Sequence, residues 1–508
     1  MPLGHSLLPV ARTLKYSKYR SFGQPNGDRL LPRNPQMREN RCNVMDPHIF
    51  REYDIRGIVG EQLTPEVVKT LANALGTYYI RHGARRIAVG HDARESSPVF
   101  AKILTEGLNA RGCDVVAIGM VPTPVLYYTL FTQDVDGGVM ITGSHNPNHH
   151  NGFKISLGTD SLFGDQIREI GEIARSEPPA LAGGESDGVK RSLDVLGHYI
   201  TDITSRISLG PRKLKVVVDS GNGVAGITAI PIYRQLGVEV IELYTEPDAT
   251  FPNHHADPTV EENLHDLIAA VRDQKADIGI AFDGDGDRIG IVDETGRIIW
   301  GDELMIPISR SVLAENPGAT IIAEVKCSQT LFDDIAAHGG NPLMWKAGHS
   351  IIKAKMKETG AELAGEMSGH IFFADRFYGF DDATYAGARV LEILSKTDKP
   401  LSELLSDIPP SFSTPELRVD CPDETKFEVV RKVADHFSMT NKVITIDGAR
   451  ISFEHGWGLV RPSNTQAILV LRFEADSHTH LADIRSRVES KVAETIAECG
   501  RSINDLAK

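Results

Sequence analysis

Short apolar runs rich in β-branched residues alternate with amphipathic segments of helical length along most of the chain. An apolar run, a polar or Gly-rich turn, an amphipathic segment ending at Gly and a second apolar run together predict a β-α-β unit. This pattern occurs over residues 86–118, 214–243 and 320–345. Three such units at this spacing predict three related α/β domains.

The pattern changes after Pro409 and Pro410. Apolar-alternating runs at 417–419 and 467–473 are combined with helix-like segments at 426–437 and 481–498, which predicts a smaller α+β domain. The fold class is therefore α/β, with three related domains and a C-terminal α+β domain. The predicted boundaries are 1–45 for an N-terminal extension, 46–190 for domain I, 191–297 for domain II, 298–409 for domain III and 410–508 for domain IV.

The first 45 residues differ from the rest in composition. Eight Lys and Arg side chains are opposed only by Asp28 and Glu39, and Pro, Gly and Asn interrupt each apolar stretch. We expect this basic arm to be disordered. The alternatives are a cleaved organellar transit peptide, a dispensable tail, or a misplaced start with Met37 or Met45 as the true first residue.

Overall charge and cysteine usage narrow the possible functions. The 508 residues carry a formal net charge of -15, whereas binding to nucleic acid requires a concentrated basic surface. Five scattered cysteines without a C-x-x-C pair indicate neither a disulfide framework nor a zinc site. No apolar run is long enough to span a membrane. We therefore expect a cytoplasmic protein that binds neither nucleic acid nor membrane.

A serine-containing turn follows the apolar run Gly137–Ile141. Its sequence is Thr142-Gly143-Ser144-His145-Asn146-Pro147, which predicts a serine on an exposed turn closed by proline. A serine hydroxyl reacts only when it is activated or already phosphorylated, and His145 and Lys154 are nearby candidates to manage its proton or charge. The alternative is a turn whose side chains satisfy backbone groups.

Three carboxylates occur at alternate positions in Asp283-Gly284-Asp285-Gly286-Asp287-Arg288. They can converge on one hard cation, and Arg288 could neutralise phosphate oxygens unless it forms a surface ion pair. Glu294 falls where a calcium EF-hand has its twelfth residue. However, Arg288 stands where that loop requires glycine, and the flanking segments read as strands. Mg²⁺ is the better prediction, and a solvated acidic turn is the alternative.

Two further segments offer polar groups. In Glu366-Met367-Ser368-Gly369-His370 the polar residues alternate, so an extended segment would point all three toward sugar hydroxyls from one face. Arg461-Pro462-Ser463-Asn464-Thr465 offers a guanidinium, hydroxyls and an amide, which suit a phosphate dianion. Taken alone, the first could be a polar surface turn and the second an ordinary capped turn.

Together and in this order, the four segments resemble the α-D-phosphohexomutase superfamily, most closely its bacterial phosphomannomutase/phosphoglucomutase branch. The likeness covers about residue 47 to the C-terminus, and it includes Tyr53-Asp54-Ile55-Arg56-Gly57 and the stretch from Val325 to Asp382. The resemblance implies four domains in a heart-shaped molecule, with one motif from each domain at a central cleft.

The resemblance also implies roles for individual residues. Ser144 would be a phosphoserine, and Asp283, Asp285 and Asp287 would hold Mg²⁺ with one of its phosphate oxygens, beside Arg288. Glu366 and Ser368 would bind the 3- and 4-hydroxyls of the sugar. The phosphate that is not reacting would be held by Arg461, Ser463, Asn464 and Thr465. The remaining substrate contacts would come from Tyr53, Arg56, Lys326, His349 and His370.

The implied reaction interconverts hexose 6-phosphates and hexose 1-phosphates of mannose and glucose through a hexose 1,6-bisphosphate, which also primes the phosphoserine form. If Glu366 and Ser368 contact only the 3- and 4-hydroxyls, the sugar can bind in two orientations. These contacts would not involve C2, the carbon at which mannose and glucose differ. His370 or Lys154 could act as general acid or base, with Arg56 as an electrostatic helper. The oligomeric state is left open, with a monomer favoured.

Three alternatives remain at this point. One is a phosphoglucosamine mutase, although Gly143, Met367 and Asn464 favour mannose and glucose. Another is a phosphosugar phosphatase in which Asp283 is the nucleophile. The third is a non-enzymatic scaffold that binds sugar phosphates or Ca²⁺.

Overall fold

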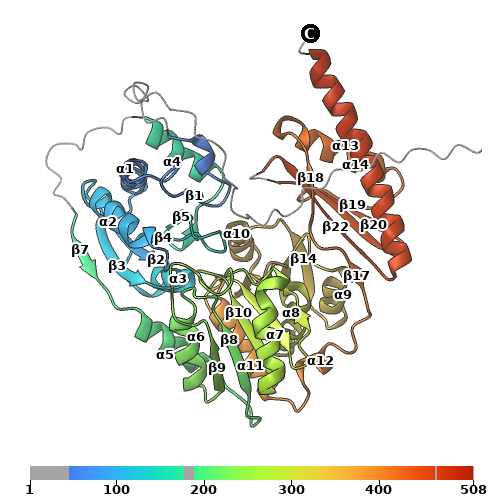
Figure 1. Ribbon diagram of the computed structural model, residues 1–508, viewed down its shortest axis with the longest axis horizontal. Helices are drawn as coiled ribbons and strands as arrows, with labels where there is room; N and C mark the ends of the chain where they lie inside the picture. Colours follow the sequence, from blue (N-terminus) through green and yellow to red (C-terminus); the bar gives the residue numbers. More distant parts are fainter. Residues whose placement is uncertain (1–44, 177–187, 464–465, 507–508) are drawn as a thin grey trace, which may run out of the picture. The chain divides into compact units, whose positions relative to one another are not determined.

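The computed structural model describes residues 45–176, 188–463 and 466–506 (Figure 1). The basic extension before residue 45 lies outside the described residues, as do Asn464 and Thr465. The chain divides into two compact units, one within Arg41–Ile408 and another within Pro409–Lys508. Each unit is described by itself below.

Three sheets in the first unit share one topology. In each, two β-α-β connections join three parallel strands, and a fourth strand returns antiparallel beside the third. The spatial orders are β3-β2-β4-β5, β9-β8-β10-β11 and β14-β13-β15-β16. The helices are required because parallel neighbours cannot be joined by a tight turn. This repeat confirms the predicted fold class and the three predicted β-α-β units.

The first sheet has seven strands in the order β1-β5-β4-β2-β3-β7, with β6 beside β5. Its strands are β1 (Ile55–Ile58), β2 (Arg86–His91), β3 (Asp114–Met120), β4 (Gly137–Ile141), β5 (His150–Leu157), β6 (Asp160–Ser161) and β7 (Lys190–Ser192). Its helices are η2 (Pro47–Ile49), α1 (Pro65–Arg81), α2 (Ser96–Asn109), α3 (Thr123–Thr132) and α4 (Asp165–Arg175). Helices α1, α2 and α4 cover one face, whereas α3 packs with the other.

The second sheet has five strands in the order β12-β11-β10-β8-β9. Its strands are β8 (Lys215–Asp219), β9 (Glu239–Leu243), β10 (Ile278–Phe282), β11 (Ile289–Asp293) and β12 (Ile298–Ile299). The associated helices are α5 (Leu196–Arg206), α6 (Gly226–Gln235), η3 (Glu261–Leu264) and α7 (His265–Gln274). Alternate strand residues face opposite sides, so Val217 packs with α7 while Val216 and Val218 pack with α6.

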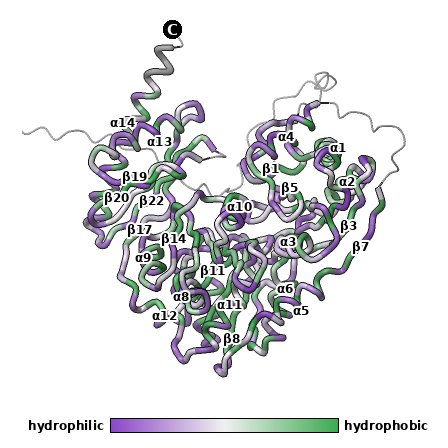
Figure 2. Tube along the Cα trace, turned by 180° about the vertical axis from the view of Figure 1, so that it is seen from behind, coloured by the Kyte–Doolittle hydropathy of each residue, from purple (hydrophilic) through white to green (hydrophobic). Residues whose placement is uncertain are grey.

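The third sheet consists of β13 (Thr320–Glu324), β14 (Asn341–Trp345), β15 (Leu363–Gly365) and β16 (Ile371–Phe373). Its helices are α8 (Gly301–Glu315), α9 (Gln329–Ala337), α10 (His349–Thr359), α11 (Ala383–Ser395) and α12 (Leu401–Leu404). One continuous hydrophobic core includes residues from all three sheets, from Ala88 to Leu405. Figure 2 shows hydrophobic residues concentrated along the inner strands and the helices that cover them.

The second unit is an antiparallel sheet packed against two helices. Its strands are β17 (Phe412–Ser413), β18 (Leu417–Asp420), β19 (Val443–Ile444), β20 (Ala449–Phe453), β21 (Gly456–Pro462) and β22 (Ile468–Ala475). The order is β17-β22-β21-β20-β19, with β18 also beside β22. Helices α13 (Asp423–Ser438) and α14 (His478–Leu506) share its hydrophobic core. The predicted α+β class is confirmed for this unit.

Four of the five cysteines lie in the described part of the chain. Cys113, Cys327, Cys421 and Cys499 are buried and carry free thiols, and Cys42 lies outside the described residues. Within the described part of the chain, each helix is too short or too polar to cross a bilayer.

Helix α11 begins at a buried carboxylate with an unusual pKa. Asp382 caps the helix by accepting from Tyr385 N, and Tyr199 Oη donates to it at 2.8 Å. Burial raises the pKa of Asp382 to about 7. Its folded-state pKa therefore lies above the value of about 4 in an unfolded chain. The folded protein holds an extra proton between these values, so this contribution to stability is lost as pH rises through 7.

We expect the free energy of unfolding to fall by about 2–3 kcal/mol between pH 5 and 8, relative to an Asp382→Asn variant that cannot ionise. Urea unfolding of both proteins at the two pH values measures this difference. Asn also caps helices well, so the variant keeps the local geometry. A constant difference between the two proteins would contradict the prediction, and Asp398→Asn, on the exposed surface, is the matched control.

Candidate active site

Three of the four predicted segments lie in equivalent turns of the repeat. Ser144 follows β4, Asp283–Asp287 follow β10, and Glu366–His370 follow β15, each before the antiparallel fourth strand. Side chains connect the turns: Ser144 Oγ donates to Asp283 Oδ2 at 2.8 Å, and Arg288 Nε donates to His370 Nε2 at 3.0 Å. The topology therefore assembles one site from segments more than two hundred residues apart.

Ser144 lies on the predicted turn, but the expectation that it is exposed is wrong. Only 3% of the surface of Ser144 is exposed to solvent. The backbone of Gly284 packs against the Ser144 carbonyl so closely that a Cβ at residue 284 would lie 2.6 Å from that oxygen. Ser144 also has a left-handed backbone (φ +49°), which is uncommon for serine and typical of functional sites. Its Oγ lies 3.1 Å from His145 Nδ1.

A buried arginine holds the serine turn in place. Arg94 is 1% exposed and donates to the carbonyl oxygens of Ser144, Asn146 and Pro147 at 2.6–2.8 Å. Asp92 accepts from Arg94 Nε at 3.0 Å and from Gly143 N at 3.1 Å. A Cβ on Gly143 would overlap the Arg94 guanidinium. Glycine before Ser144 is therefore required by this packing.

The three aspartates converge as the alternating spacing predicts. Asp283, Asp285 and Asp287 are each 0% exposed, and one oxygen from each lies within 4.8 Å of the others. Burial raises the pKa of Asp283 well above its usual value, and the neighbouring carboxylates raise it further. Thr123 Oγ1 donates to Asp285 Oδ2 at 2.6 Å. Uncompensated like charges at this separation are unfavourable, so the cluster needs cations.

The donor set fits a divalent cation. Asp285 Oδ1 and Asp287 Oδ1 are buried and have no hydrogen-bond partner among the described residues. A buried carboxylate oxygen without a partner is costly unless it binds a metal or another cation. The EF-hand alternative fails because strands β10 and β11 flank the loop, and Glu294 accepts from Ser402 instead of joining the aspartates.

Lys154 supplies positive charge directly to this cluster. Its Nζ donates to Asp285 Oδ2 at 2.7 Å and to Asp287 Oδ2. Burial alone lowers the pKa of Lys154, but the two carboxylates raise it by more, so the pKa lies well above its usual value. This pairing favours a charge-neutralising role for Lys154 over a proton acceptor.

His370 lies between a cation and a buried carboxylate. Its Nε2 accepts from Arg288 Nε, and its Nδ1 lies 3.0 Å from Asp381 Oδ2. An arginine always donates, so Nε2 must carry the lone pair and Nδ1 the proton that faces Asp381. Asp381 also accepts from Lys353 Nζ at 3.0 Å and lies 3.8 Å from His349 Nδ1. One buried carboxylate thus lies beside three basic side chains and accepts a hydrogen bond from one of them, Lys353.

The segment Glu366–His370 is a turn, and the prediction that it is extended is wrong. Glu366 N donates to the His370 carbonyl at 2.9 Å, and Gly369 has φ +91°, so the chain reverses between β15 and β16. Glu366 and His370 are buried, whereas Ser368 is half-buried. A left-handed glycine inside the segment breaks the two-residue alternation on which the prediction depended.

Tyr53, His349 and Lys326, which the resemblance implies as substrate contacts, lie near this turn, whereas Arg56 is paired with Asp54. Glu366 Oε1 accepts from Gly348 N at 2.6 Å, and Tyr53 Oη donates to the Ala347 carbonyl at 3.0 Å. The Tyr53 and His349 rings meet edge to face, 6.4 Å apart. Lys326 Nζ lies 3.8 Å from Glu324 Oε1, and Arg56 donates to Asp54 Oδ2. Tyr53 therefore links domain I to the loop before α10.

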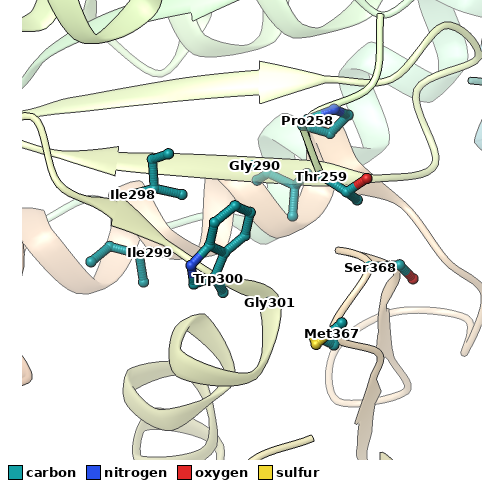
Figure 3. Close-up of a pocket in the computed structure, with 10 residues that line it drawn as sticks. Pro258, Thr259, Gly290, Ile298, Ile299, Trp300, Gly301, Met367 and Ser368 are labelled. Atoms are coloured by element: carbon teal, nitrogen blue, oxygen red, sulfur yellow. The ribbon is translucent and has the colours of Figure 1, made fainter. Parts of the chain in front are cut away.

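A small pocket lies beside the same turn. Trp300, Met367 and Ser368 line it together with Pro258 and Thr259 (Figure 3). The first residue of α8, Gly301, contacts the turn so closely that a Cβ there would lie 2.5 Å from the Glu366 carbonyl and 2.8 Å from that of Met367. Helix α8 therefore supports the backbone that presents Glu366 and Ser368.

Gly301→Ala should displace this turn, because the opposing atoms are backbone and cannot rotate away. We expect KM for a hexose phosphate, the substrate class that the resemblance implies, to rise about tenfold, since small misplacements of binding groups are costly. Steady-state kinetics measures the change. Gly197→Ala is the matched control, because Gly197 also lies at the start of a helix but has no atom within 4 Å of its Cβ position. An unchanged KM in Gly301→Ala would contradict a supporting role for α8.

The fourth segment belongs to the second unit. Arg461 lies near the end of β21 and donates to Asp447 Oδ2 at 2.8 Å. Ser463 Oγ accepts from Gln466 N at 3.2 Å, and Ser463 N donates to the Ile468 carbonyl at 3.0 Å. Asn464 and Thr465 lie outside the described residues, so their predicted roles stay predictions.

Sequence reasoning missed five residues that build the site. They are scattered in the sequence and lack a motif of their own: Asp92, Arg94, Thr123, Lys353 and Asp381. Asp92 and Thr123 follow strands β2 and β3 closely, where polar residues meet at the carboxyl edge of a parallel sheet. Their position at this edge is the signal from which the sequence could have identified Asp92 and Thr123 as site residues. Nothing in the spacing of Lys353 indicates that it faces Asp381.

Comparison with known proteins identifies the family. Residues 47–179, 197–296 and 300–412 match phosphoglucomutase/phosphomannomutase alpha/beta/alpha domains I, II and III, and residues 416–491 match the C-terminal domain. The predicted domain boundaries stay predictions.

Individual proteins agree with this assignment. The chain is 48% identical over 440 residues to a phosphomannomutase/phosphoglucomutase of Pseudomonas putida, covering 86% of this chain and 94% of that protein. It is 45% identical over 447 residues to a phosphoglucomutase of Neisseria gonorrhoeae, covering 87% and 96%. A crystal structure of a phosphoglucomutase/phosphomannomutase family protein from Burkholderia thailandensis superposes with a TM-score of 0.83 at 43% identity, covering 89% and 98%. The chain belongs to the phosphoglucomutase/phosphomannomutase family.

Proposed function

We propose that this protein moves a phosphoryl group reversibly between the 6- and 1-positions of glucose and mannose phosphates, with Ser144 as the carrier. The observation that carries the proposal is the buried contact of 2.8 Å between Ser144 Oγ and Asp283 Oδ2, within a cluster of three aspartates. Three buried carboxylates beside a serine hydroxyl serve no structural purpose. They are explained if the serine is phosphorylated and shares a cation with them.

Mg²⁺ is the proposed cation, held by Asp283, Asp285, Asp287 and phosphorylated Ser144. When bound, it neutralises charge on the phosphoryl group and on the aspartates. The partnerless oxygens of Asp285 and Asp287 support this assignment. Magnesium prefers a few carboxylates together with phosphate and water oxygens, which matches the donor set.

Residues of the chain neutralise charge on the phosphoryl group and transfer the proton of the attacking hydroxyl. In the first transfer the bond between Ser144 Oγ and phosphorus breaks, and a bond forms between phosphorus and a hydroxyl oxygen of the sugar phosphate. Lys154 and Arg288 are cations placed to stabilise the phosphoryl oxygens. The attacking hydroxyl loses a proton, and the leaving Ser144 Oγ gains one. Lys154 is held as a cation by two carboxylates, so we assign the lost proton to His370. His370 Nε2 can accept it once Arg288 turns from Nε2 toward the phosphoryl oxygens.

The bisphosphate formed in this way must turn over before its other phosphoryl group returns to Ser144. Glu366 and Ser368 are proposed to bind the 3- and 4-hydroxyls, whose arrangement is similar in both orientations. Tyr53, Arg56, Lys326 and His349 are proposed to complete the substrate contacts, and Arg461, Ser463, Asn464 and Thr465 to bind the second phosphate. Hexose 1,6-bisphosphate would prime unphosphorylated enzyme.

The geometry weighs against the phosphatase alternative. Asp283 Oδ2 accepts from Ser144, and Asp283 Oδ1 accepts from the backbone N–H groups of Asp287 and Arg288 at 3.1 Å each. Both oxygens already accept hydrogen bonds, which makes Asp283 a weaker nucleophile than a carboxylate without such partners. A phosphoglucosamine mutase shares this chemistry, so the choice between the two mutases depends on the sugar.

Conversion of glucose 1-phosphate, mannose 1-phosphate and glucosamine 1-phosphate, with Mg²⁺ and a trace of glucose 1,6-bisphosphate, tests the proposal. We expect turnover of the first two sugars and acid-stable phosphate on Ser144. Turnover of glucosamine 1-phosphate alone would replace the substrate assignment. An acid-labile acyl phosphate on Asp283 would overturn the mechanism.

A further inference from the structure

Two histidines and an aspartate meet on the surface of the second unit, in a cluster that the proposed reaction does not use. His455 Nδ1 lies 2.9 Å from Asp476 Oδ2, and His480 Nδ1 lies 2.5 Å from Asp476 Oδ1. The two imidazole rings are nearly parallel, with centroids 3.9 Å apart and an interplanar angle of 8°. Each ring therefore directs its Nδ1 atom toward the carboxylate of Asp476.

Backbone contacts hold the three residues on separate elements. His455 lies in the tight turn between β20 and β21, where Phe453 pairs with Gly456. Asp476 follows β22, and its N–H donates to the His455 carbonyl at 3.1 Å. His480 lies in the first turn of α14, where its N–H donates to Ser477 Oγ at 3.2 Å. The convergence is therefore set by the fold and not by one flexible segment.

We propose that His455, Asp476 and His480 form a surface binding site for Zn²⁺. Imidazole nitrogen and carboxylate oxygen are ligands that Zn²⁺ prefers, and three protein ligands leave one position of a tetrahedral site for water. Zinc–ligand bonds of about 2.1 Å place tetrahedral ligand atoms roughly 3.4 Å apart. One ligand atom from each of the three residues lies within 4.8 Å of the others. Rotation of the two rings out of their parallel stack would bring these atoms to that spacing.

Hydrogen bonding without a metal is the competing explanation, because each neutral imidazole can donate its Nδ1–H to one oxygen of Asp476. The two explanations differ in the Nδ1 proton, which Zn²⁺ replaces at each ring. Two hydrogen bonds alone confer no specific affinity for Zn²⁺, so zinc binding separates the two explanations. The nearby His478 packs against Phe412, with centroids 4.1 Å apart, and is not part of the cluster.

Zinc at this position would join the β20–β21 turn to the start of α14. A ligand that binds only the folded state raises its thermal stability. We expect Zn²⁺ to raise the Tm of the unit's unfolding transition by about 3 °C. The site is separate in composition from the proposed Mg²⁺ site, which contains no imidazole ligand. The surface site therefore favours a metal that binds imidazole, such as Zn²⁺, over Mg²⁺.

Zinc titration of the full chain by isothermal titration calorimetry tests the proposal, with any affinity tag removed. Excess Mg²⁺ and glucose 1,6-bisphosphate keep the aspartate cluster from competing. We expect His455→Gln and His480→Gln each to weaken one class of Zn²⁺ site at least about tenfold, and the double variant to lose it. Co²⁺ absorption in the visible range should show the same loss, and the Tm shift should disappear.

His338→Gln is the matched control. His338 is also exposed and lies 3.4 Å from the carboxylate of Asp334, but that pair is not part of a cluster of three ligands in the described chain. This variant should bind Zn²⁺ like the unmodified protein. Equal zinc affinity and stoichiometry in the unmodified and double-variant proteins would overturn the site. A zinc-independent Tm in the unmodified protein would do the same.

Discussion

Ser144→Ala is expected to lower kcat/KM for glucose 1-phosphate by about 10⁴-fold or more. The substitution removes the oxygen that carries the phosphoryl group, and enzymes that lose a covalent nucleophile usually lose activity on this scale. The folded state should survive, because Arg94 holds the turn through backbone carbonyls that the variant keeps. Coupled assays of glucose 6-phosphate formation, with and without bisphosphate primer, measure the effect.

Ser156→Ala is the control for loss of a buried hydroxyl in the same hairpin, because Ser156 is 1% exposed in β5. It should retain most of the activity. Added glucose 1,6-bisphosphate should not rescue Ser144→Ala, whereas it should activate dephosphorylated unmodified enzyme. Substantial activity in Ser144→Ala would rule out Ser144 as the carrier.

Asp283→Asn should stabilise the metal-free protein while abolishing activity. Burial and two neighbouring carboxylates penalise the charge of Asp283, so removing that charge should raise the free energy of unfolding without Mg²⁺ by about 1–3 kcal/mol. Asparagine can still accept from the N–H groups of Asp287 and Arg288. Activity should fall by about 10³-fold or more, because a metal ligand is lost. Urea unfolding with EDTA and with Mg²⁺, together with the mutase assay, checks both effects.

Asp381→Asn is a matched substitution with the opposite expected sign. Asp381 is also 0% exposed, but it faces Lys353, His370 and His349, which hold its pKa well below the usual value against the effect of burial. Neutralising it leaves Lys353 buried without its partner and should destabilise the fold by about 3 kcal/mol. If Asp283→Asn destabilises the metal-free protein to a similar extent, the aspartate cluster is a structural ion-pair network and the proposed metal site is wrong.

The repeat topology explains why so much of the site was predictable. Each of the three candidate segments in the first unit lies between a buried strand and its antiparallel return, so each appears in the sequence as a polar, Gly-containing stretch between apolar runs. The run Ile278–Phe282 before the aspartates and the run Ile289–Asp293 after them are fully buried strands. Hydrophobic periodicity locates such strands, and the polar residues between them can then be recognised as candidate site residues.

The errors arose where local conformation depends on distant atoms. Ser144 was expected to be exposed, but Gly284, 140 positions along the chain, covers it. Glu366 to His370 were expected to be extended, but Gly369 packs against the carbonyl of Ile289 in a left-handed conformation. A sequence pattern describes the preferences of a segment, whereas these conformations are imposed by another sheet.

The sequence by itself determined the α/β class, the three β-α-β units, the identity of the proposed carrier and the presence of three converging carboxylates. These properties depend on periodicity, glycine and short-range spacing, which are local. Only the tertiary structure decided that Lys154 neutralises Asp285 and Asp287, that Arg94 holds the Ser144 turn, and that Asp381 lies beside His370. Each of these contacts joins separate elements, because a buried charge is stable only beside a partner that the fold brings to it. Ser144 therefore has its chemistry from its own residue type, but its environment from two sheets, through Arg94 of the first and through Asp283 and Gly284 of the second.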